Sequence, residues 1–209
     1  MNGRLAIVGA SGHGKVVADT ALECGWDSLA FFDDFRAGQD GVCDLPIVGP
    51  TTALLTSLSD YAGVIVAIGH NRTRLAKVRE LLSAGARLVT LAHPRAYVAR
   101  DVRLDFGTVV FAGAVVQPSA SIGVGVIVNT GATVDHDCQL ADGVHVCPGA
   151  HPAGGVSVGE CTWLGIGCVV KQYITIGADV VVGGAAAVMA AVPDGITVVG
   201  VPARPRMES

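Results

Sequence analysis

The sequence predicts an α/β domain built on a parallel sheet, followed by a parallel β-helix. Strand-like apolar runs alternate with segments of helical spacing up to residue 94. From Val98 onward, an aliphatic residue returns at every sixth position. The composition agrees, because 51% hydrophobic residues, only 5% aromatic residues and 28 glycines suit closely stacked backbone.

The first part of the chain alternates in a regular order. The predicted strands are RLAIVG (4–9), SLAFFDD (28–34), GVIVAIG (63–69) and RLVTLAHP (87–94), and the predicted helices cover 14–25, 51–59 and 71–85. This alternation favours a parallel sheet whose strands are joined by crossover helices. With a boundary at His93-Pro94, we expect a Rossmann-like domain over 1–94 and a β-helix domain with a C-terminal tail over 95–209.

The second part of the chain is a hexapeptide repeat. From Val98 to Val188, fifteen of the sixteen positions spaced six apart are aliphatic, and the exception is Pro152. Four residues after each of these positions comes a small or β-branched residue. Such a repeat is typical of a parallel β-helix, in which each short strand buries one aliphatic side chain. An ordinary sandwich of alternating strands would instead show a period of two and irregular spacing.

Several classes of protein are disfavoured by composition. The longest apolar run, Val180 to Val192, has thirteen residues and is too short to span a bilayer, and the N-terminus lacks a signal-peptide pattern. Six cysteines without a CxxC pair indicate reduced thiols in a cytoplasmic protein. A net charge of −4 argues against nucleic-acid binding.

The strict hexapeptide period resembles that of the left-handed β-helix acyltransferases, over residues 98 to about 204. This resemblance implies a triangular prism with 18 residues in each coil. It also implies a homotrimer with active sites in the grooves between subunits.

One polar motif interrupts the repeat, Asp135-His136-Asp137. His136 follows the inward Val134 by two residues and is therefore expected near a corner of the prism, where one coil further on Gly154 should stack beside it. A histidine can remove a proton from a nucleophile, and a bare glycine amide can bind an oxyanion. The alternative is that this motif is a solvated corner without a role.

The stretch GVIVNTGATVDHDC, with VHVCPGAH after it, looks like the catalytic coil of nucleotide-sugar N-acetyltransferases. The resemblance implies that His136 is the general base, that Asp137 supports it in place of the usual glutamate, and that the Gly154 amide binds the oxyanion. It further implies that His145 lies near the thioester of acetyl-CoA. Pro148, Ile166 and Gly184 are 18 residues apart, and by resemblance His145, Ile166 and Gly184 line the acetyl-CoA groove, with no metal.

The N-terminal loop GASGHGK (9–15) follows a strand and opens a helix, a position that suits a phosphate. It departs from a P-loop because Val16 replaces Ser or Thr, and a merely tight turn is the alternative interpretation. The combination GASGHGK, FFDD and AIGHN nevertheless resembles the nucleotide-sugar-binding domain of the same acetyltransferases. The substrate-binding residues that it implies are Ser11, Gly12, His13, Asp33, Asp34, Gly69 and Asn71.

Together these features predict acetyl transfer from acetyl-CoA to the 4-amine of a UDP-linked amino-dideoxy sugar, as in bacillosamine-type glycan biosynthesis. We expect direct attack with His136 as the base, because Cys138 falls on a core position of the repeat. Three alternatives remain at this point. They are O-acetylation of a sialic acid or another sugar, a carbonic-anhydrase-like zinc trimer using His136, His145 and His151, and a nucleotide-sugar-binding protein without catalysis.

Overall fold

The fold was obtained as a computed structural model that describes residues 3–36 and 41–206. Its N-terminal part is a four-stranded parallel sheet in the order β3-β2-β1-β4. The strands are β1 (Arg4–Val8), β2 (Ser28–Phe32), β3 (Ile47–Gly49) and β4 (Gly63–Val66), and the helices are α1 (Gly12–Glu23), α2 (Thr51–Leu55) and α3 (Asn71–Ser83), with a 3-10 turn η1 (Leu58–Asp60). The predicted parallel sheet with crossover helices is therefore confirmed.

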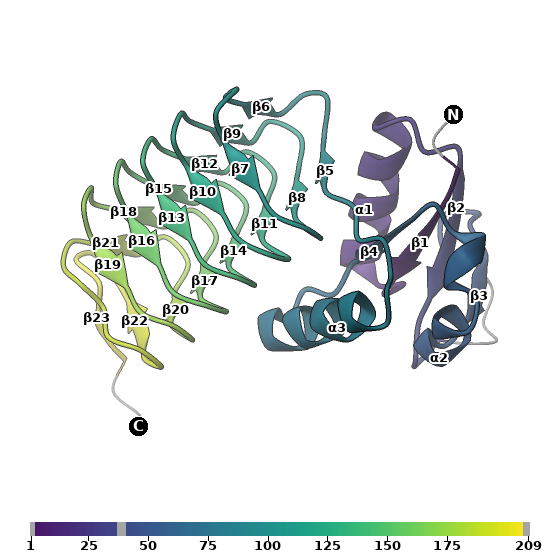
Figure 1. The fold of residues 1–209 in the computed structure, drawn as a ribbon. Coiled ribbons are helices and arrows are strands. Elements are labelled where there is room, and N and C mark those ends of the chain that lie inside the picture. Colours follow the sequence, from purple (N-terminus) through teal and green to yellow (C-terminus); the bar gives the residue numbers. More distant parts are fainter. Residues whose placement is uncertain (1–2, 37–40, 207–209) are drawn as a thin grey trace.

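The remaining strands wind into a three-sided prism (Figure 1). One side contains β7 (Arg103–Leu104), β10 (Ser121–Ile122), β13 (Gln139–Leu140), β16 (Ser157–Val158) and β19 (Thr175–Ile176). The second side contains β5 (Leu91–Ala92), β8 (Val109–Val110), β11 (Ile127–Val128), β14 (His145–Val146), β17 (Trp163–Leu164), β20 (Val181–Val182), β22 (Thr197–Val199) and β23 (Arg204–Pro205). The third side is made of β6 (Tyr97–Val98), β9 (Val115–Val116) and β12 (Thr133–Val134), followed by β15 (His151–Pro152), β18 (Val169–Val170) and β21 (Ala187–Val188).

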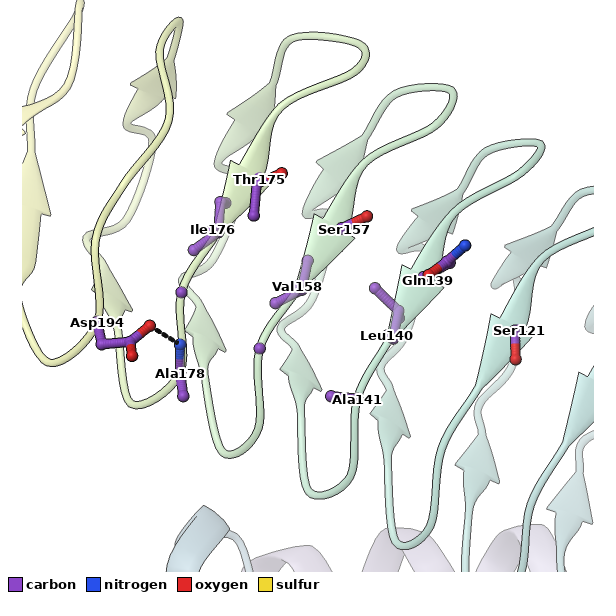
Figure 2. A pocket seen from close by; sticks show the side chains of 12 residues that line it. Ser121, Gln139, Leu140, Ala141, Ser157, Val158, Thr175, Ile176, Ala178 and Asp194 are labelled. Carbon is purple, nitrogen blue, oxygen red and sulfur yellow. Dashed lines mark hydrogen bonds between the residues drawn. The ribbon is translucent and has the colours of Figure 1, made fainter.

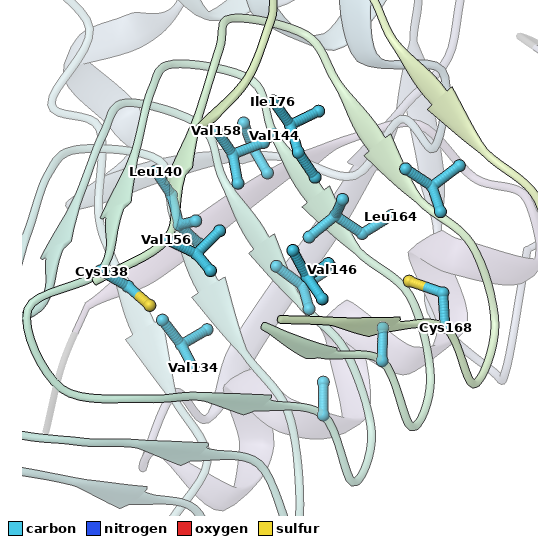
Figure 3. Close-up of a cluster of buried hydrophobic side chains, with 14 of the residues drawn as sticks. Val134, Cys138, Leu140, Val144, Val146, Val156, Val158, Leu164, Cys168 and Ile176 are labelled. Carbon is cyan, nitrogen blue, oxygen red and sulfur yellow. The ribbon is translucent and has the colours of Figure 1, made fainter. Parts of the chain in front are cut away.

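Each coil of the prism spans 18 residues. Ile122 pairs with Leu140 and Val128 pairs with Val146, in parallel register. The inward side chains from Val110 to Val188 are buried, and they stack into one core column along the prism (Figure 3). The hexapeptide repeat and its predicted inward positions are confirmed.

The prism and the N-terminal sheet share a second core. Helix α1 lies between them (Figure 1), and its Val17 and Ala21 pack in one cluster with Phe111 and Ile127 of the prism. The other face of the sheet is covered by α2 and α3, in a cluster that includes Leu54 and Val78. The two parts of the chain are therefore packed together through α1, and side chains of α3 also bond to the prism.

The structure differs from the sequence prediction in three segments. Strand β3 was not predicted, because it has only three residues and follows a loop. The predicted strand over 87–94 is split, since Leu88 bridges to Val64 in the first sheet whereas β5 pairs with β8 of the prism. The predicted helix over 51–59 is α2 followed by η1.

Within the described residues, every helix is too short or too polar to cross a bilayer.

Candidate active site

His136 lies at the corner between β12 and β13, with about half of its side chain exposed. Its Nδ1 is 2.7 Å from Oδ2 of Asp137, and its backbone N–H donates to Asp135 Oδ1 at 2.8 Å. The hydrogen bond to Asp137, together with the charges of Asp135 and Asp137, raises the pKa of the His136 imidazole against a smaller opposing effect of desolvation. Asp137 therefore orients the ring and leaves Nε2 as the nitrogen that can accept a proton.

The carboxylate reaches the ring because the backbone of Asp137 is left-handed, with φ at 59°. Aspartate tolerates this conformation better than most residues with a Cβ, because its short polar side chain bonds locally. The same corner position in the neighbouring coils is occupied by Ser119, Gly155 and Tyr173, which also have positive φ. The corner turn thus fixes the place of Asp137.

Gly154 stacks on the His136 ring, as its spacing of one coil predicts. A Cβ at position 154 would lie 2.5 Å from Nε2 of His136 and 2.6 Å from its Cε1, so only glycine fits without moving the ring. The neighbouring Gly155 N–H donates to the carbonyl of His136 at 2.8 Å. Among the backbone hydrogen bonds of the described residues, none uses the N–H of Gly154.

His145 is buried in β14 on the side of the prism that faces the N-terminal domain, with 8% of its surface exposed. Its ring stacks on Trp163 with the centroids 5.8 Å apart, and its Nε2 is 3.0 Å from Nδ2 of Asn129. Within the described residues, its buried Nδ1 has no hydrogen-bond partner. Burial, followed by the charges of Arg74 and His13, lowers the pKa of His145 to about 3, so the ring is neutral at physiological pH.

His136 and His145 lie on different parts of one prism. The former sits at the corner before the five-stranded side, and the latter lies on the eight-stranded side, where the charges of Arg74 in α3 and His13 in α1 act on it. The structure of a single chain therefore does not bring these two predicted residues together.

The predicted groove column is present as a ladder at another corner. Gly167 N–H donates to Pro148 O at 3.0 Å, and Ala185 N–H donates to Ile166 O at 2.8 Å, which places 148, 166 and 184 in register. Ile166 is 64% exposed, and a Cβ at Gly184 would lie 3.4 Å from the Ile166 carbonyl. The column is thus accessible to a long ligand, although its role stays a prediction.

The N-terminal loop leaves Ser11 and Gly12 exposed at the start of α1. A Cβ at Gly12 would meet nothing within 4 Å, so the helix N-terminus is open. His13 points the other way. Its ring packs edge-on against Phe111 of the prism, and burial, with a smaller contribution from Arg74, lowers its pKa to about 4.

Asp33 and Asp34 hold the loops around this helix N-terminus. Asp33 Oδ2 accepts from Ala10 N–H at 2.8 Å, and Asp34 Oδ1 accepts from Thr51 N–H at 2.6 Å. The Nζ of Lys77 lies 3.7 Å from Asp34 Oδ2. Both carboxylates remain partly exposed, so a nucleoside contact stays a prediction for them.

Gly69 and Asn71 differ in accessibility. A Cβ at Gly69 would meet nothing within 4 Å, which leaves this backbone open at the end of β4. Asn71 is 7% exposed, and its Nδ2 donates to the carbonyls of Cys161 and Thr162 at 2.9 and 3.1 Å. Its Oδ1 accepts from Arg74. The amide of Asn71 thus joins α3 to the prism, at a place where Asn71 also lines a small recess with Trp163 and Asp179, so a substrate contact stays a prediction.

The thiols of the prism are poor nucleophiles. Cys138 is buried in the core as predicted, and desolvation raises its pKa. Cys147 is buried too and receives a contact from Trp163 Nε1, and burial raises its pKa to about 12. In the part of the chain that the structure describes, no three His, Cys, Asp or Glu side chains converge to hold a metal ion.

A wide, shallow recess of about 520 Å³ lies on the five-stranded side of the prism (Figure 2). Its outward side chains are small or neutral, such as Ser121, Gln139 and Thr175. Its acidic residue, Asp194, accepts a hydrogen bond from Ala178 N–H at 2.8 Å. The lining contains no histidine, cysteine or lysine, so the catalytic candidates remain at the His136 corner.

Sequence reasoning missed Asn129, Trp163 and Arg74. Trp163 follows His145 by one coil and pairs with it across β14 and β17, so the 18-residue spacing could have revealed this contact. Asn129 contacts His145 within the prism at a spacing of 16 residues, which the 18-residue coil does not reveal. The contacts of Arg74 depend on how the two parts of the chain pack, which the repeat pattern does not encode.

Comparisons with known proteins identify relatives of this chain. The sequence pattern described as the PglD N-terminal domain matches residues 4–81. A GDP-perosamine N-acetyltransferase of Escherichia coli O157:H7 is 32% identical over 189 residues, which cover 87% of this chain and 84% of that protein.

Two solved structures have the same fold over nearly all of the chain. The acetyltransferase domain of PglB from Neisseria gonorrhoeae FA1090, in complex with acetyl coenzyme A, has 41% sequence identity and a TM-score of 0.94, covering 99% of this chain and 100% of that one. PerB from Caulobacter crescentus, in complex with CoA and GDP-perosamine, has 39% identity and a TM-score of 0.93, covering 99% of each chain. With its left-handed β-helix, its parallel sheet and its coverage of these relatives, the chain belongs to the family of acetyl-CoA-dependent nucleotide-sugar N-acetyltransferases.

Proposed function

We propose that this enzyme transfers the acetyl group of acetyl-CoA to the 4-amine of a nucleoside-diphosphate-linked amino-dideoxy sugar, with His136 as the general base. The observation that carries the proposal is the exposed imidazole of His136, whose Nδ1 is held by Asp137 and whose Nε2 faces Gly154. Sugar acetylation needs a base for the amine and a donor for the oxyanion, and the closeness of His136 Nε2 to Gly154 supports assigning these two roles to them.

The chemical step is a direct transfer. Nε2 of His136 takes a proton from the sugar amine while the nitrogen bonds to the thioester carbon. The carbon–sulfur bond then breaks, and the proton passes from His136 to the departing sulfur, which releases the thiol of CoA. The Gly154 N–H is the donor that we assign to the oxyanion. The raised pKa of the Cys147 thiol argues against an acyl-enzyme on that residue.

For the acceptor, the sequence predicts a UDP-linked sugar, as in bacillosamine-type biosynthesis. A UDP-N-acetylbacillosamine N-acetyltransferase of Bacillus subtilis is 37% identical, but over only 117 residues. The relative that covers 87% of the chain is a GDP-perosamine enzyme, so a GDP-linked sugar is the second candidate. The open N-terminus of α1 at Ser11 and Gly12 suits the diphosphate of either nucleotide.

A thiol-release assay with acetyl-CoA and UDP-, GDP- and dTDP-linked 4-amino sugars tests this proposal. One sugar should turn over, and the His136→Ala variant should lose a factor of about 10²–10⁴ in rate. The matched control is His151→Ala, an exposed histidine of the same prism, whose Nδ1 lies 2.9 Å from Thr133 Oγ1. Turnover that survives in His136→Ala would contradict the assignment of the base.

We also propose that the enzyme works as a homotrimer with its sites between subunits. One chain leaves His136 at an exposed corner and His145 and Ile166 elsewhere on the prism, so a site that uses all three needs two chains. Mixing His136→Ala subunits with His145→Ala subunits by co-expression should restore activity, because some sites then combine two intact residues. A mixture as inactive as its parents would contradict a shared site.

A further inference from the structure

The first turn of α3 binds a column of backbone carbonyls along one corner of the prism. Gly125, Gly143 and Cys161 occupy this corner in successive coils, 18 residues apart. Arg74 Nε donates to Gly125 O at 2.7 Å and its Nη2 donates to Gly143 O at 2.7 Å. Asn71 Nδ2 donates to Cys161 O at 2.9 Å. Because Asn71 and Arg74 are three residues apart, one helix face contacts three coils.

Arg74 also holds the loop that follows β4. Its Nη1 donates to the carbonyls of Ile68 and Gly69, both at 3.0 Å, and its Nη2 donates to Asn71 Oδ1 at 2.9 Å. The five N–H groups of a guanidinium are thereby all engaged. The planar guanidinium directs five donors along fixed lines, whereas a lysine ammonium has only three donors on one atom and cannot make all of these bonds.

The charge of Arg74 is buried without a carboxylate partner among the described residues. The side chain is 1% exposed, and all of its acceptors are neutral oxygens. Burial lowers its pKa to about 10, so it remains charged at neutral pH. A buried unpaired cation is costly, and it persists where the surrounding structure gains from the geometry that it imposes.

The position of Arg74 relates it to both candidate ligand sites. On one side it fixes Gly69, beside the open loop predicted to contact the nucleotide sugar. On the other side it binds Gly143 and, at 3.5 Å, Val144, the residue directly before His145. Its charge also contributes to keeping His13 and His145 neutral.

We propose that Arg74 is a positioning residue of the transfer reaction, which fixes the nucleotide-binding domain in register with the coils that carry His145. This inference rests on the proposed function, since it assigns one substrate to each side of the domain interface. A displacement of about 1 Å between two reacting groups costs about a hundredfold in rate, so a rigid interface acts directly on turnover.

Two further arginines of α3 cross the same interface and provide the control. Arg72 binds Asp179 at 2.6 Å, and Arg79 binds Glu160 at 2.6 Å and Asp142 at 3.2 Å. The arginine side chains are 70% and 52% exposed, so water screens these ion pairs. These exposed pairs also join α3 to the prism, but they hold the two parts of the chain in position less rigidly than the buried Arg74 does.

The experiment compares Arg74→Lys with Arg79→Gln. In each variant, the affinity for the nucleoside diphosphate and for CoA is measured separately by calorimetry, and kcat is measured with both substrates. Arg74→Lys should bind each ligand within about twofold of the wild type, whereas its kcat should fall by about 30- to 100-fold. Arg79→Gln should keep both affinities and kcat within about twofold.

Asn71→Ala is a milder second variant, should Arg74→Lys fail to fold. It removes the bonds to Cys161 and Thr162 and the Arg74 contact but keeps the guanidinium in place, so kcat should fall by about tenfold with unchanged nucleotide affinity. A fall in nucleotide affinity would instead make Asn71 a substrate contact, as the family resemblance implies, and would overturn this part of the inference.

The inference is overturned if both variants keep the wild-type kcat while their melting temperatures drop, because Arg74 would then serve stability alone. It is also overturned if both binary affinities fall in parallel with kcat. A wild type that binds both ligands but releases no thiol with any amino sugar would instead contradict the proposed function.

Discussion

The corner at His136 and the domain interface at His145 place the same side chain in opposite environments. At the corner, an exposed imidazole lies beside two carboxylates, and the hydrogen bond to Asp137 raises its pKa. At the interface, an imidazole 8% exposed lies near Arg74, and burial lowers its pKa to about 3.

This difference separates two kinds of chemistry in one repeat. A base must be reachable and must bind a proton readily, which the corner provides through solvent and a carboxylate. A buried neutral imidazole can only donate or accept hydrogen bonds, so His145 is suited to orienting a ligand. Val134 and Val146, the inward residues near the two histidines, are both fully buried valines. The outward neighbours therefore decide the environment of each imidazole.

The largest effect on turnover is expected from adding a side chain beside the His136 ring. In Gly154→Ala, the new Cβ would lie 2.5 Å from Nε2 of His136 and push the ring away, so turnover should fall by about a hundredfold. The control is Gly131→Ala, at a corner with nothing within 4 Å, in the same column as Ala185. A Gly154→Ala enzyme with wild-type turnover would show that the base does not act at this face of the ring.

At the domain interface, we expect the two buried histidines to make the free energy of unfolding depend on pH. In the unfolded chain, His13 and His145 have the ordinary histidine pKa of about 6.5. In the folded chain, burial lowers the pKa of His13 to about 4 and that of His145 to about 3. The unfolded state therefore binds more protons below pH 6.5, and stability is lost as the pH falls, by about 2 kcal/mol for each histidine at pH 5.

Urea unfolding at pH 5 and pH 7.5 measures this loss. His145→Gln and His13→Gln should each lose less stability than the wild type between the two pH values. His136→Gln should not flatten the profile, because the folded state raises the pKa of His136. An unchanged slope in the two interface variants would contradict the burial of neutral rings.

A smaller effect concerns the strain at the corner. Tyr173 has φ at 59° and is 75% exposed, with its ring over Gly155. Tyr173→Gly should raise the free energy of unfolding by about 1 kcal/mol, since glycine adopts this backbone without strain. Ala185→Gly, with φ at 55° in another corner column, should give a similar gain. A loss of stability in Tyr173→Gly would show that the ring packs more than its exposure suggests.

The smallest effect is expected from Asp137→Asn. Because the carboxylate raises the pKa of His136, its loss should lower this pKa and move the acid limb of the rate profile to lower pH. The pair is exposed, so the rate on the plateau should fall by no more than about fivefold. A limb that moves to higher pH would contradict the assigned cause.

Much of the fold was predictable because the pattern is strictly periodic. The inward positions follow from a spacing of six, and the stacking of Gly154 on His136 follows from one coil of 18 residues. Segments without a period were harder. Strand β3 is only three residues long, and the strand predicted over 87–94 was divided between two sheets by pairing that depends on distant partners.

The sequence by itself determined the prism, the inward core and the place of the His136 corner, because these depend on local spacing and on the burial of aliphatic side chains. Only the tertiary structure decided that Asn71 and Arg74 cap the carbonyls of the prism, and that His13 and His145 are buried near one cation. Those contacts join residues as far as 91 positions apart, and their energies come from desolvation at the domain interface, which no periodicity records.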